Sequence, residues 1–406
     1  MTRRKLFLFI LILIVVSQVP FVYRRYRLGR LRNTIQALAA QRVTNQSTSN
    51  YVDYKGVIHV HTSLGGHSTG TFSELIAAAK ANQLDFVIMT EHAQAEFDTA
   101  ALTLNGVQSG VLFVNGNEVS TGNGDRLLLI PGSASAAQAG TQSTQEVIDK
   151  QRTSGGLTFA AYPSESGNWQ STSVDGVEVY NLYTNTKQLN KLTTFFDGIW
   201  SYRGFPDLMF ANFFTRPDEN LRRWDEANAN RKLIAIGGND AHSNVGFGLG
   251  DATGKQLLGV KLDPYERSFR TVRTHVLIKK DKPLTRESLL EAISLGHCYV
   301  SFDIFSEPTG FQFAVTNTDQ IMGDRIYAQN EAELLATAPL ASRFVLFKNG
   351  TAVEQKTGTR VQFTVTPTGI YRVEVYLDSL PAPAKGQPWI ISNPIHVASV
   401  DPSRVF

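Results

Sequence analysis

Short apolar runs that end in polar residues recur along the middle of the chain and predict β-strands. Helical patterns separate several of them, and Thr71 and Glu74 have the spacing of a capping box that begins a helix running to about Asn82. Repeated strand–helix units predict an α/β domain, either a parallel barrel or a doubly wound sheet. The predicted strands are Gly56–His61, Asp85–Thr90, Gly110–Val119, Arg126–Ile130, Leu157–Ala161, Val177–Tyr180, Leu233–Ile236, Val272–Ile278 and Cys298–Phe302, and the other helices are Ser143–Thr153, Gln188–Tyr202, Pro217–Asn230 and Arg286–Leu295.

After Asp303 the pattern changes to alternating apolar and polar residues, which is typical of half-buried strands. Turn sequences such as Asn349-Gly350 separate these runs, and only a weak helical period appears, at Asn330–Ala336. We therefore predict a β/α domain over residues 52–303 and a small antiparallel β-sandwich over residues 304–406.

The N-terminus carries a wholly apolar run, Leu6–Val16, which weakens towards Tyr23. Counted to Tyr23 it approaches the roughly 20 residues of a spanning helix, whereas counted to Val16 it has the length of a signal peptide's apolar region. Basic residues flank it, and no small-residue cleavage site follows. This favours an uncleaved membrane anchor over residues 1–23, with an extracytoplasmic catalytic domain, over a buried core helix. Residues 24–51 then read as a juxtamembrane helix, Leu31–Arg42, and a polar linker, Asn45–Asn50.

The formal net charge of +3 changes the picture little, because the excess of basic residues lies near the N-terminus. The rest of the chain is slightly acidic, so the sequence shows no nucleic-acid-binding surface. The single cysteine, Cys298, excludes an intramolecular disulfide.

Histidines and carboxylates gather where the predicted strands end, in the motifs His59-Val60-His61-Thr62, Thr90-Glu91-His92, Gly116-Asn117-Glu118 and Asn239-Asp240-Ala241-His242, with His67 shortly after the first. Because strand side chains alternate, the two histidines of an H-x-H pair share one face. The carboxyl ends of parallel strands are where ligands collect in such folds. Imidazole and carboxylate together suit a site for several metal ions.

These motifs resemble those of the PHP superfamily, named for polymerase and histidinol phosphatase domains, over about residues 54–303. The resemblance implies a distorted (β/α)7 TIM-like barrel that holds up to three zinc, manganese or iron ions and hydrolyses phosphoesters or other esters. It also implies a branch of the family with a C-terminal β-domain. Carried over by motif, one metal would be bound by His59, His61, Glu118 and Asp240, and another by His67, His92 and His242.

The chain departs from the family pattern at two positions that would serve a third, central metal. Arg126 follows Asp125 where the family usually has a ligand histidine, and Tyr162 stands where another is expected. Asp125 could still coordinate if its loop shifts, and Tyr162 could do so weakly. A fixed Arg126 guanidinium could instead grip a phosphate or carboxylate, so we list Arg126 and Asp240 as candidate catalytic residues.

The favoured function is a membrane-anchored, metal-dependent hydrolase with two or three metals and a small ester substrate, which the resemblance implies is a phosphoester. The alternatives are a metal-binding pseudoenzyme that serves recognition, and a hydrolase of non-phosphate esters. Glu178 and Asn181 are candidates to orient the metal ligands. His275, His297 and His396 match no motif and are predicted to be structural.

Overall fold

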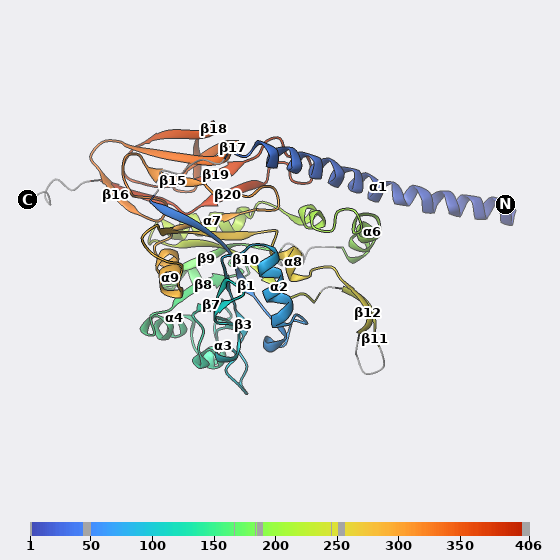
Figure 1. Ribbon diagram of the computed structural model, residues 1–406, viewed down its shortest axis with the longest axis horizontal. Helices are drawn as coiled ribbons and strands as arrows, with labels where there is room; N and C mark the ends of the chain where they lie inside the picture. Colours follow the sequence, from blue (N-terminus) through green and yellow to red (C-terminus); the bar gives the residue numbers. More distant parts are fainter. Residues whose placement is uncertain are drawn as a thin grey trace, which may run out of the picture.

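The computed structural model describes residues 2–43, 50–165, 167–182, 184, 190–244, 246–250 and 256–399. Within these residues the chain is a mixed α/β protein with one sheet of 19 strands and a separate hairpin, β11 (Gly246–Gly250) and β12 (Gln256–Lys261) (Figure 1). The predicted linker Asn45–Asn50 lies outside them except for Asn50. So do the first residues of the predicted helix Gln188–Tyr202, whose described part is α6 (Lys191–Ser201).

The strands of the predicted β/α region pair in a closed circuit. Strand β1 pairs with both β2 and β10. Strand β2 pairs with β5, and β3, which follows β2 along the chain, pairs with β6, which follows β5. From β6 the pairing continues through β7, β8 and β9 back to β10. The two pairings made by β7 are antiparallel, and the others between neighbours in the circuit are parallel. The bounds are β1 (Tyr51–Val60), β2 (Phe86–Ile88), β3 (Glu91–His92), β5 (Val111–Val114), β6 (Asn117–Ser120), β7 (Arg126–Ile130), β8 (Leu157–Ala161), β9 (Gly176–Asn181) and β10 (Ile234–Ala241).

One predicted strand is interrupted in the structure. The predicted run Gly110–Val119 is divided into β5 and β6, whereas the predicted run Asp85–Thr90 contains only β2, and β3 begins just after it. Gly116 lies at the break between β5 and β6, and a Cβ there would come within 2.3 Å of the Met89 carbonyl oxygen. The close approach of two backbones at this point therefore requires glycine.

Alternate residues of the circuit strands face two separate cores. Ile58, Ile88 and Ile236 pack in a cluster that takes one face of β1, β2, β5, β7, β8 and β10, which we interpret as the interior of the circuit. Val57 and Val87 face the other way and pack with Leu75, Ala78 and Ala79 of α2 (Phe72–Ala81). Both hydrogen bonds of the predicted capping box between Thr71 and Glu74 are present at the start of α2.

Further helices and short elements connect the strands of the circuit. Helix α4 begins with a second capping box, from Ser143 to Glu146, and α9 begins at the predicted Arg286. The remaining elements of this region are α3 (Thr99–Leu102), β4 (Gly106–Gln108), α4 (Thr144–Thr153), α7 (Asp218–Asn228), α8 (Tyr265–Ser268), β13 (Arg273–Lys279), α9 (Arg286–Ser294), β14 (Cys298–Ser301) and four 3-10 helices, η1 (Ser63–Gly65), η2 (Ala134–Thr141), η3 (Trp169–Ser171) and η4 (Leu208–Phe213).

Helix α1 (Arg3–Gln41) is a single helix of 39 residues, so the predicted juxtamembrane helix Leu31–Arg42 is helical to Gln41 and continues the apolar helix without a break. The helix continues through Pro20 and through the arginines that follow, because its second half is held by packing: Leu28, Leu31 and Leu38 are buried against the rest of the protein. Its first half projects away from the body (Figure 1). By length and composition α1 is able to cross a membrane, with a mean hydropathy of 2.6 in its most apolar window and none of that window buried.

The C-terminal region is built of strands, but it is neither wholly antiparallel nor separate from the first sheet. Strand β16 pairs with β21 in parallel, and β20 pairs with β14, which belongs to the preceding region. The weak helical period at Asn330–Ala336 proves to be strand, because these residues enter the long strand β17 and pair with β15 and β18. The strands are β15 (Gln312–Val315), β16 (Arg325–Ala328), β17 (Ala332–Lys348), β18 (Thr351–Val365), β19 (Gly369–Tyr376), β20 (Pro388–Ser392) and β21 (Ile395–Ser399).

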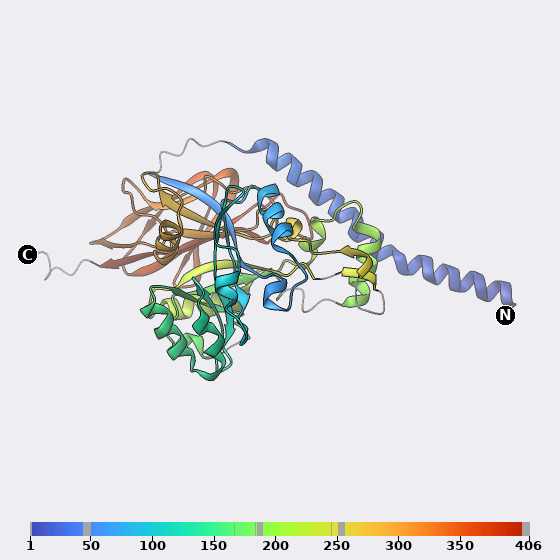
Figure 2. The ribbon, with the colours of Figure 1, turned by 60° about the horizontal axis from the view of Figure 1, so that its bottom comes forward.

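Buried ion pairs join this region to α7. Arg372 of β19 contacts Asp225 at 2.7 Å, and Glu374 accepts from Arg216 at 2.5 Å. The two ends of these bridges lie in different predicted domains, so they fix β19 against α7 and the segment just before it. Figure 2 shows the C-terminal strands, in orange and red, next to the β/α region.

Candidate metal centre

His59 and His61, at the end of β1, turn their rings into the same space through an irregularity in the strand. Ile58 faces the interior, so regular alternation would point His59 away from it and Val60 back towards it. Val60 instead packs in the outer core, which shows that the alternation is broken between Ile58 and Val60. Instead His59 has φ of 69°, and the pairing of β1 with β10 shifts register between Ile58 and Val60. Asp240 on β10 has φ of 50°. These left-handed residues break the alternation and aim both side chains at one point.

Four ligand atoms from three strands converge at that point. His59 Nε2 lies 3.4 Å from both Glu118 Oε2 and Asp240 Oδ1, and His61 Nε2 lies 3.3 and 3.5 Å from the same two oxygens. Ligands at 2.0–2.2 Å from a metal in a tetrahedron are about 3.3–3.6 Å apart, by the geometry of the solid. These four distances fall in the range of the edges of a tetrahedral coordination shell, and ligand atoms of His59, His61 and Glu118 all lie within 4.8 Å of one another.

Buried atoms in this cluster have no hydrogen-bond partner. Neither ring nitrogen of His61 is hydrogen-bonded, and the same holds for Oδ1 of Asp240. Both residues are at most 4% exposed, and buried polar atoms of this kind are normally satisfied. A divalent cation would satisfy His61 Nε2 and Asp240 Oδ1 at once, and neutral imidazole with carboxylate is a donor set that zinc, manganese and iron accept. The residues present therefore fit a metal.

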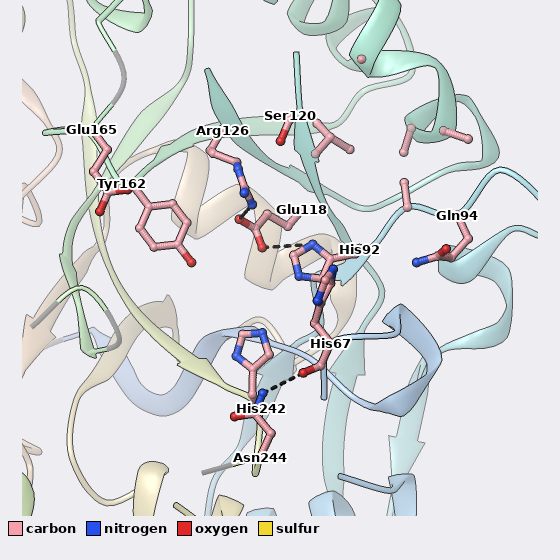
Figure 3. A pocket seen from close by; sticks show the side chains of 15 residues that line it. His67, His92, Gln94, Glu118, Ser120, Arg126, Tyr162, Glu165, His242 and Asn244 are labelled. Carbon is pink, nitrogen blue, oxygen red and sulfur yellow. Dashed lines mark hydrogen bonds and ion pairs between the residues drawn. The ribbon is translucent and has the colours of Figure 1, made fainter. Parts of the chain in front are cut away.

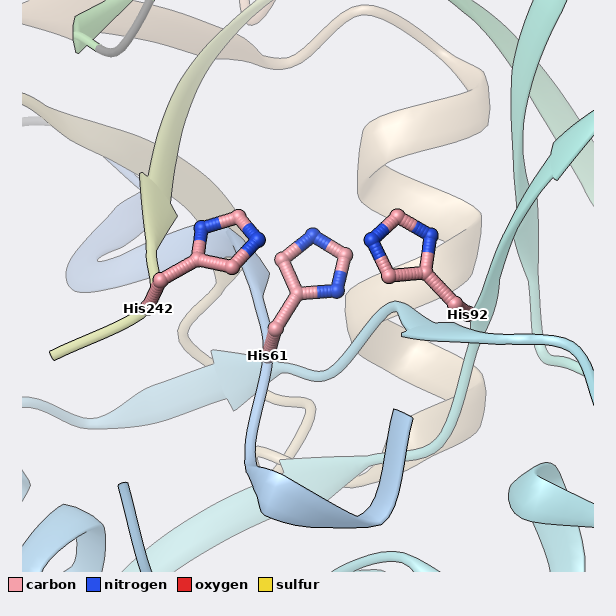
Figure 4. A group of neighbouring side chains, drawn as sticks. All are labelled: His61, His92 and His242. Carbon is pink, nitrogen blue, oxygen red and sulfur yellow. The ribbon is translucent and has the colours of Figure 1, made fainter. Parts of the chain in front are cut away.

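Three imidazole rings stand side by side in the cluster, as Figure 4 shows. The His61 ring stacks on His92 with centroids 4.5 Å apart and on His242 with centroids 4.4 Å apart. Ligand atoms of these three residues lie within 4.8 Å of one another. His242 Nδ1 lies 2.9 Å from the main-chain carbonyl of Asp240, so the proton sits on Nδ1 and Nε2 is left to bind a metal.

His67 is near this group but outside the three-histidine set. Its ring meets the edge of the His92 ring with centroids 5.0 Å apart, and both residues line a cavity that opens onto the cluster. The structure therefore brings His92 and His242 together with His61, whereas the carried-over ligand set placed them with His67.

Glu178 of β9 fixes the orientation of His59. Its Oε1 lies 2.5 Å from His59 Nδ1, and its Oε2 accepts from the Asn181 side chain at 2.9 Å. All three side chains are buried. A Cβ on Gly238 would come within 1.5 Å of Glu178 Oε1, so only glycine lets this carboxylate reach His59. A carboxylate behind a ligand histidine sets its tautomer and leaves Nε2 towards the metal.

Arg126 and Tyr162 occupy the far side of the two ligand carboxylates. Arg126 Nη1 donates to Glu118 Oε1 at 2.9 Å, and the Tyr162 hydroxyl donates to Asp240 Oδ2 at 2.5 Å. Each carboxylate thus has one oxygen facing the histidines and the other capped by a donor. Asp125 does not join the site, because its carboxylate accepts from Thr144 Oγ1 at 2.6 Å and from the backbone of Asn168.

The protonation states of His61, His92 and the two ligand carboxylates suit metal binding. Burial lowers the pKa of His59, but Glu178, Asp240 and Glu118 outweigh it and raise that pKa well above its usual value, so a metal would have to displace a proton from this ring. Burial lowers the pKa of His61 to about 4 and that of His92 to about 3, so both rings are neutral near pH 7. Burial raises the pKa of Glu118 and Asp240, but contact with His59 and the neighbouring histidines outweighs it. The pKa of Glu118 falls to about 2, and that of Asp240 falls well below its usual range. The ligand carboxylates are therefore ionised.

A cavity of about 630 Å³ opens directly onto the cluster. Figure 3 shows Arg126 and Tyr162 on one side of it and His67, His92 and His242 on the other. The walls are largely polar, and the lining side chains also include Gln94, Glu118, Ser120, Glu165 and Asn244. A small polar or anionic substrate has room here beside the candidate metal ligands.

The histidines outside the motifs have other partners. His275 lies between Asp53 at 2.8 Å and Asp303 at 3.3 Å. Burial lowers its pKa, but these two carboxylates outweigh it and raise the pKa to about 10, so the ring is a cation with no lone pair for a metal. His297 contacts Asp324 at 2.9 Å, and burial lowers the pKa of His396 to about 4.

Two supporting residues escaped the sequence reasoning. Glu91, inside a recognised motif, is fully buried and accepts from the backbone and hydroxyl of Thr62 at 2.9 and 2.6 Å, which ties β3 to the segment after His61. Tyr265 donates to the His61 carbonyl at 2.5 Å. The position of Glu91 beside His92 was a usable signal, whereas Tyr265 is 204 residues from His61 in a short helix and gave none.

No family model matches the chain, and no curated protein matches it. Several solved structures are similar to it. A two-domain protein from Bacteroides vulgatus ATCC 8482, described as containing a predicted PHP-like metal-dependent phosphoesterase, is 16% identical, with 86% of this chain and 98% of that chain covered and a TM-score of 0.40. PsfC from Pseudomonas syringae PB-5123 is 12% identical, with 62% and 92% covered and a TM-score of 0.38.

Endonuclease Q, solved with a 27-mer DNA duplex that carries an abasic lesion, is 12% identical, with 59% of this chain and 56% of that chain covered and a TM-score of 0.35. The first of the three structures carries the name of the superfamily that the sequence motifs resemble. The expectation that this chain has no nucleic-acid-binding surface stays a prediction.

Proposed function

We propose that this protein is a metal-dependent hydrolase of the PHP superfamily that acts on phosphoesters, and that its closed circuit of strands is the distorted barrel of that superfamily. One observation carries the proposal: the Nε2 atoms of His59 and His61 lie 3.3–3.5 Å from one oxygen each of Glu118 and Asp240, which are distances found between ligands of one metal ion. The unpartnered ring nitrogens of buried His61 support it, because buried polar atoms normally have a partner and a metal ion would provide one.

A bound divalent metal supplies a hydroxide nucleophile near neutral pH by lowering the pKa of water, and it polarises the substrate oxygen. The protein's own residues bind and orient. Glu178 orients His59 through its contact with Nδ1. The ionised Asp240 contributes both a ligand oxygen and negative charge at the reacting centre, so we propose that it acts as metal ligand and catalytic residue at once. Arg126, with 44% of its side chain exposed and its guanidinium at the cavity, is placed to grip a substrate phosphate.

The number of metals follows from how the carboxylates are used. Glu118 Oε1 and Asp240 Oδ2 are the oxygens that would face a central metal, and Arg126 and Tyr162 already hold them. We therefore propose two metals, one on the four-atom set and one among His67, His92 and His242, with zinc, manganese or iron as candidates. The guanidinium charge of Arg126 replaces part of the charge of a third ion.

The location of the enzyme is part of the same proposal. The exposed apolar half of α1 anchors the chain in a membrane, and the basic residues at both ends fit an uncleaved anchor. The large folded part is proposed to lie on the extracytoplasmic side, because large domains translocate largely regardless of flanking charge.

A substrate panel tests the activity. The full chain in detergent, loaded with zinc or manganese, is assayed on a phosphomonoester, a phosphodiester and a carboxylic ester. We expect turnover of a phosphoester that disappears on chelation, returns with metal, and is lost in His61→Ala while the melting temperature stays near that of the wild type. Turnover that survives both chelation and His61→Ala would overturn the proposal.

The capping of both carboxylates by Arg126 and Tyr162 favours a second candidate, a metal-binding protein whose cavity recognises a ligand without hydrolysing it. In that case metal binds with the same ligands, but none of the three ester classes is hydrolysed. An anionic product analogue would still bind and would raise the melting temperature of the metal-loaded chain. A carboxylic ester hydrolysed in preference to phosphoesters would instead identify a hydrolase of non-phosphate esters.

A further inference from the structure

Helix α6 carries exposed apolar side chains on one face. Leu192 and Ile199 are 65% and 59% exposed, and Phe195, which lies between them, is 42% exposed. Positions three, four and seven apart fall on one side of a helix. Exposed apolar residues gathered on one helical face mark a surface that meets an apolar phase or a partner.

Three contacts fix this helix against α1. Trp200 Nε1 of α6 donates to Gln18 at 3.0 Å, and the rings of Phe196 and Phe21 lie 5.1 Å apart. Asp197 accepts from Arg24 at 2.7 Å. The views in Figures 1 and 2 both show α6 beside α1 at the point where α1 leaves the body of the protein.

That point is where the apolar part of α1 ends. At 1.5 Å per residue, the stretch from Leu6 to Tyr23 is about 26 Å long, which is close to the ~30 Å hydrocarbon thickness of a bilayer. Arg24 and Arg25 follow at once. If α1 spans a membrane, the membrane surface lies at the level of Gln18 to Arg24, and α6 is held at that same level.

The charges of α6 also suit a lipid surface. Its one acidic residue, Asp197, is 4% exposed and paired with Arg24, so the helix presents no carboxylate to solvent. Arg203 is exposed just beyond its end, and Arg24 keeps 40% of its side chain exposed. Apolar residues on one face with basic residues beside them are the pattern of a helix that lies in the interface of an anionic membrane.

We propose that α6 is a second membrane contact, lying in the interfacial layer with Leu192, Phe195 and Ile199 among the upper acyl chains. This inference rests on the proposed membrane anchor. A lipid surface is favoured over a second copy of the chain because α1 already holds α6 at the level of the bilayer. The two contacts together stop the folded part from turning about α1 and hold it close to the membrane surface.

Fluorophores placed at single cysteines test the depth of α6 in the full chain. Burial raises the pKa of the Cys298 thiol to about 12, so the native cysteine does not compete for the label. Labels are placed through Ile199→Cys on α6, Ile12→Cys on α1 and Val353→Cys on β18, all exposed apolar positions. The chains are reconstituted in phosphatidylcholine–phosphatidylglycerol vesicles with a nitroxide on the upper acyl chain.

We expect the nitroxide lipid to quench the label at position 199 and to leave the label at position 353 bright. A further Leu192→Asp change should reduce quenching at position 199 and leave position 12 unaffected.

If position 12 is quenched and position 199 is no dimmer than position 353, the anchor stands and the inference is wrong. If positions 12 and 199 both stay bright, the membrane anchor itself is wrong. Energy transfer between chains labelled at position 199, persisting as lipid dilutes the protein, would replace the lipid surface with a second copy.

Discussion

Replacing Glu178 with glutamine is expected to weaken metal binding without removing a ligand. The side chain keeps its size and an oxygen that accepts from His59 Nδ1, but the 2.5 Å contact changes from a charged to a neutral hydrogen bond. Hydrogen bonds to charged groups contribute about 1.5–3 kcal/mol and neutral ones about 0.5–1.5. The difference of about 1.4 kcal/mol corresponds to a roughly tenfold loss of affinity, at the lower end of the 10–100-fold typical of residues that orient metal ligands.

The assay is a zinc titration of the full chain in detergent, in competition with a chromophoric chelator. Gly238→Ala perturbs the same contact sterically, since its Cβ would meet Glu178 Oε1 at 1.5 Å, and should lower the affinity further. Glu226→Gln, the same change on the exposed surface of α7, serves as the control. Unchanged affinity in Glu178→Gln, or an equal loss in Glu226→Gln, would refute the assigned role of Glu178.

Three further results are expected. Asp125→Asn should leave the metal content unchanged and lower the free energy of unfolding by about 1–3 kcal/mol in denaturant titrations, because its carboxylate serves Thr144 rather than the metals. Tyr162→Phe should change zinc affinity in the chelator assay by less than about tenfold, since it removes a donor to Asp240 and no ligand; a complete loss of metal would mean that the phenol itself coordinates. The pKa of His275 is raised to about 10 by Asp53 and Asp303 against the effect of burial, so its contribution to stability is complete below about pH 6.5 and is lost as the pH rises through about 10. Denaturant titrations between pH 6 and pH 11 should show this fall, and a flat profile would contradict it.

Much of the site was predictable because its ligands follow apolar strands of ordinary pattern. The recognised motifs lie at the ends of β1 and β10, in the short strand β3 and at the start of β6, and parallel pairing brings these points together. The capping box at Thr71 likewise predicted the start of α2, because both of its hydrogen bonds are local.

The geometry within the cluster was not predictable, because it depends on backbone that departs from strand alternation. His59, Tyr162 and Asp240 all have positive φ, at 69°, 47° and 50°, although none is glycine. Such conformations are imposed by the surrounding fold and leave no mark in a single sequence. Strand alternation correctly predicted that His59 and His61 share a face. It did not predict the irregularity at His59 that turns both rings towards the interior.

Other errors arose where tertiary packing overrides local pattern. The sequence analysis began the juxtamembrane helix only at Leu31, yet Leu28, Leu31 and Leu38 pack against the body and α1 is continuous from Arg3 to Gln41. The weak helical period near residue 332 was overridden because neighbouring strands were available to pair with it.

The central claim is that this chain binds metal through His59, His61, Glu118 and Asp240. The most direct test is the metal content of the full chain, purified in detergent without added metal and measured by elemental mass spectrometry beside Asp240→Asn. We predict about two metals per chain in the wild type, with at least one lost in Asp240→Asn. No metal in the wild type, and none taken up on titration with zinc, manganese or iron, would contradict the account.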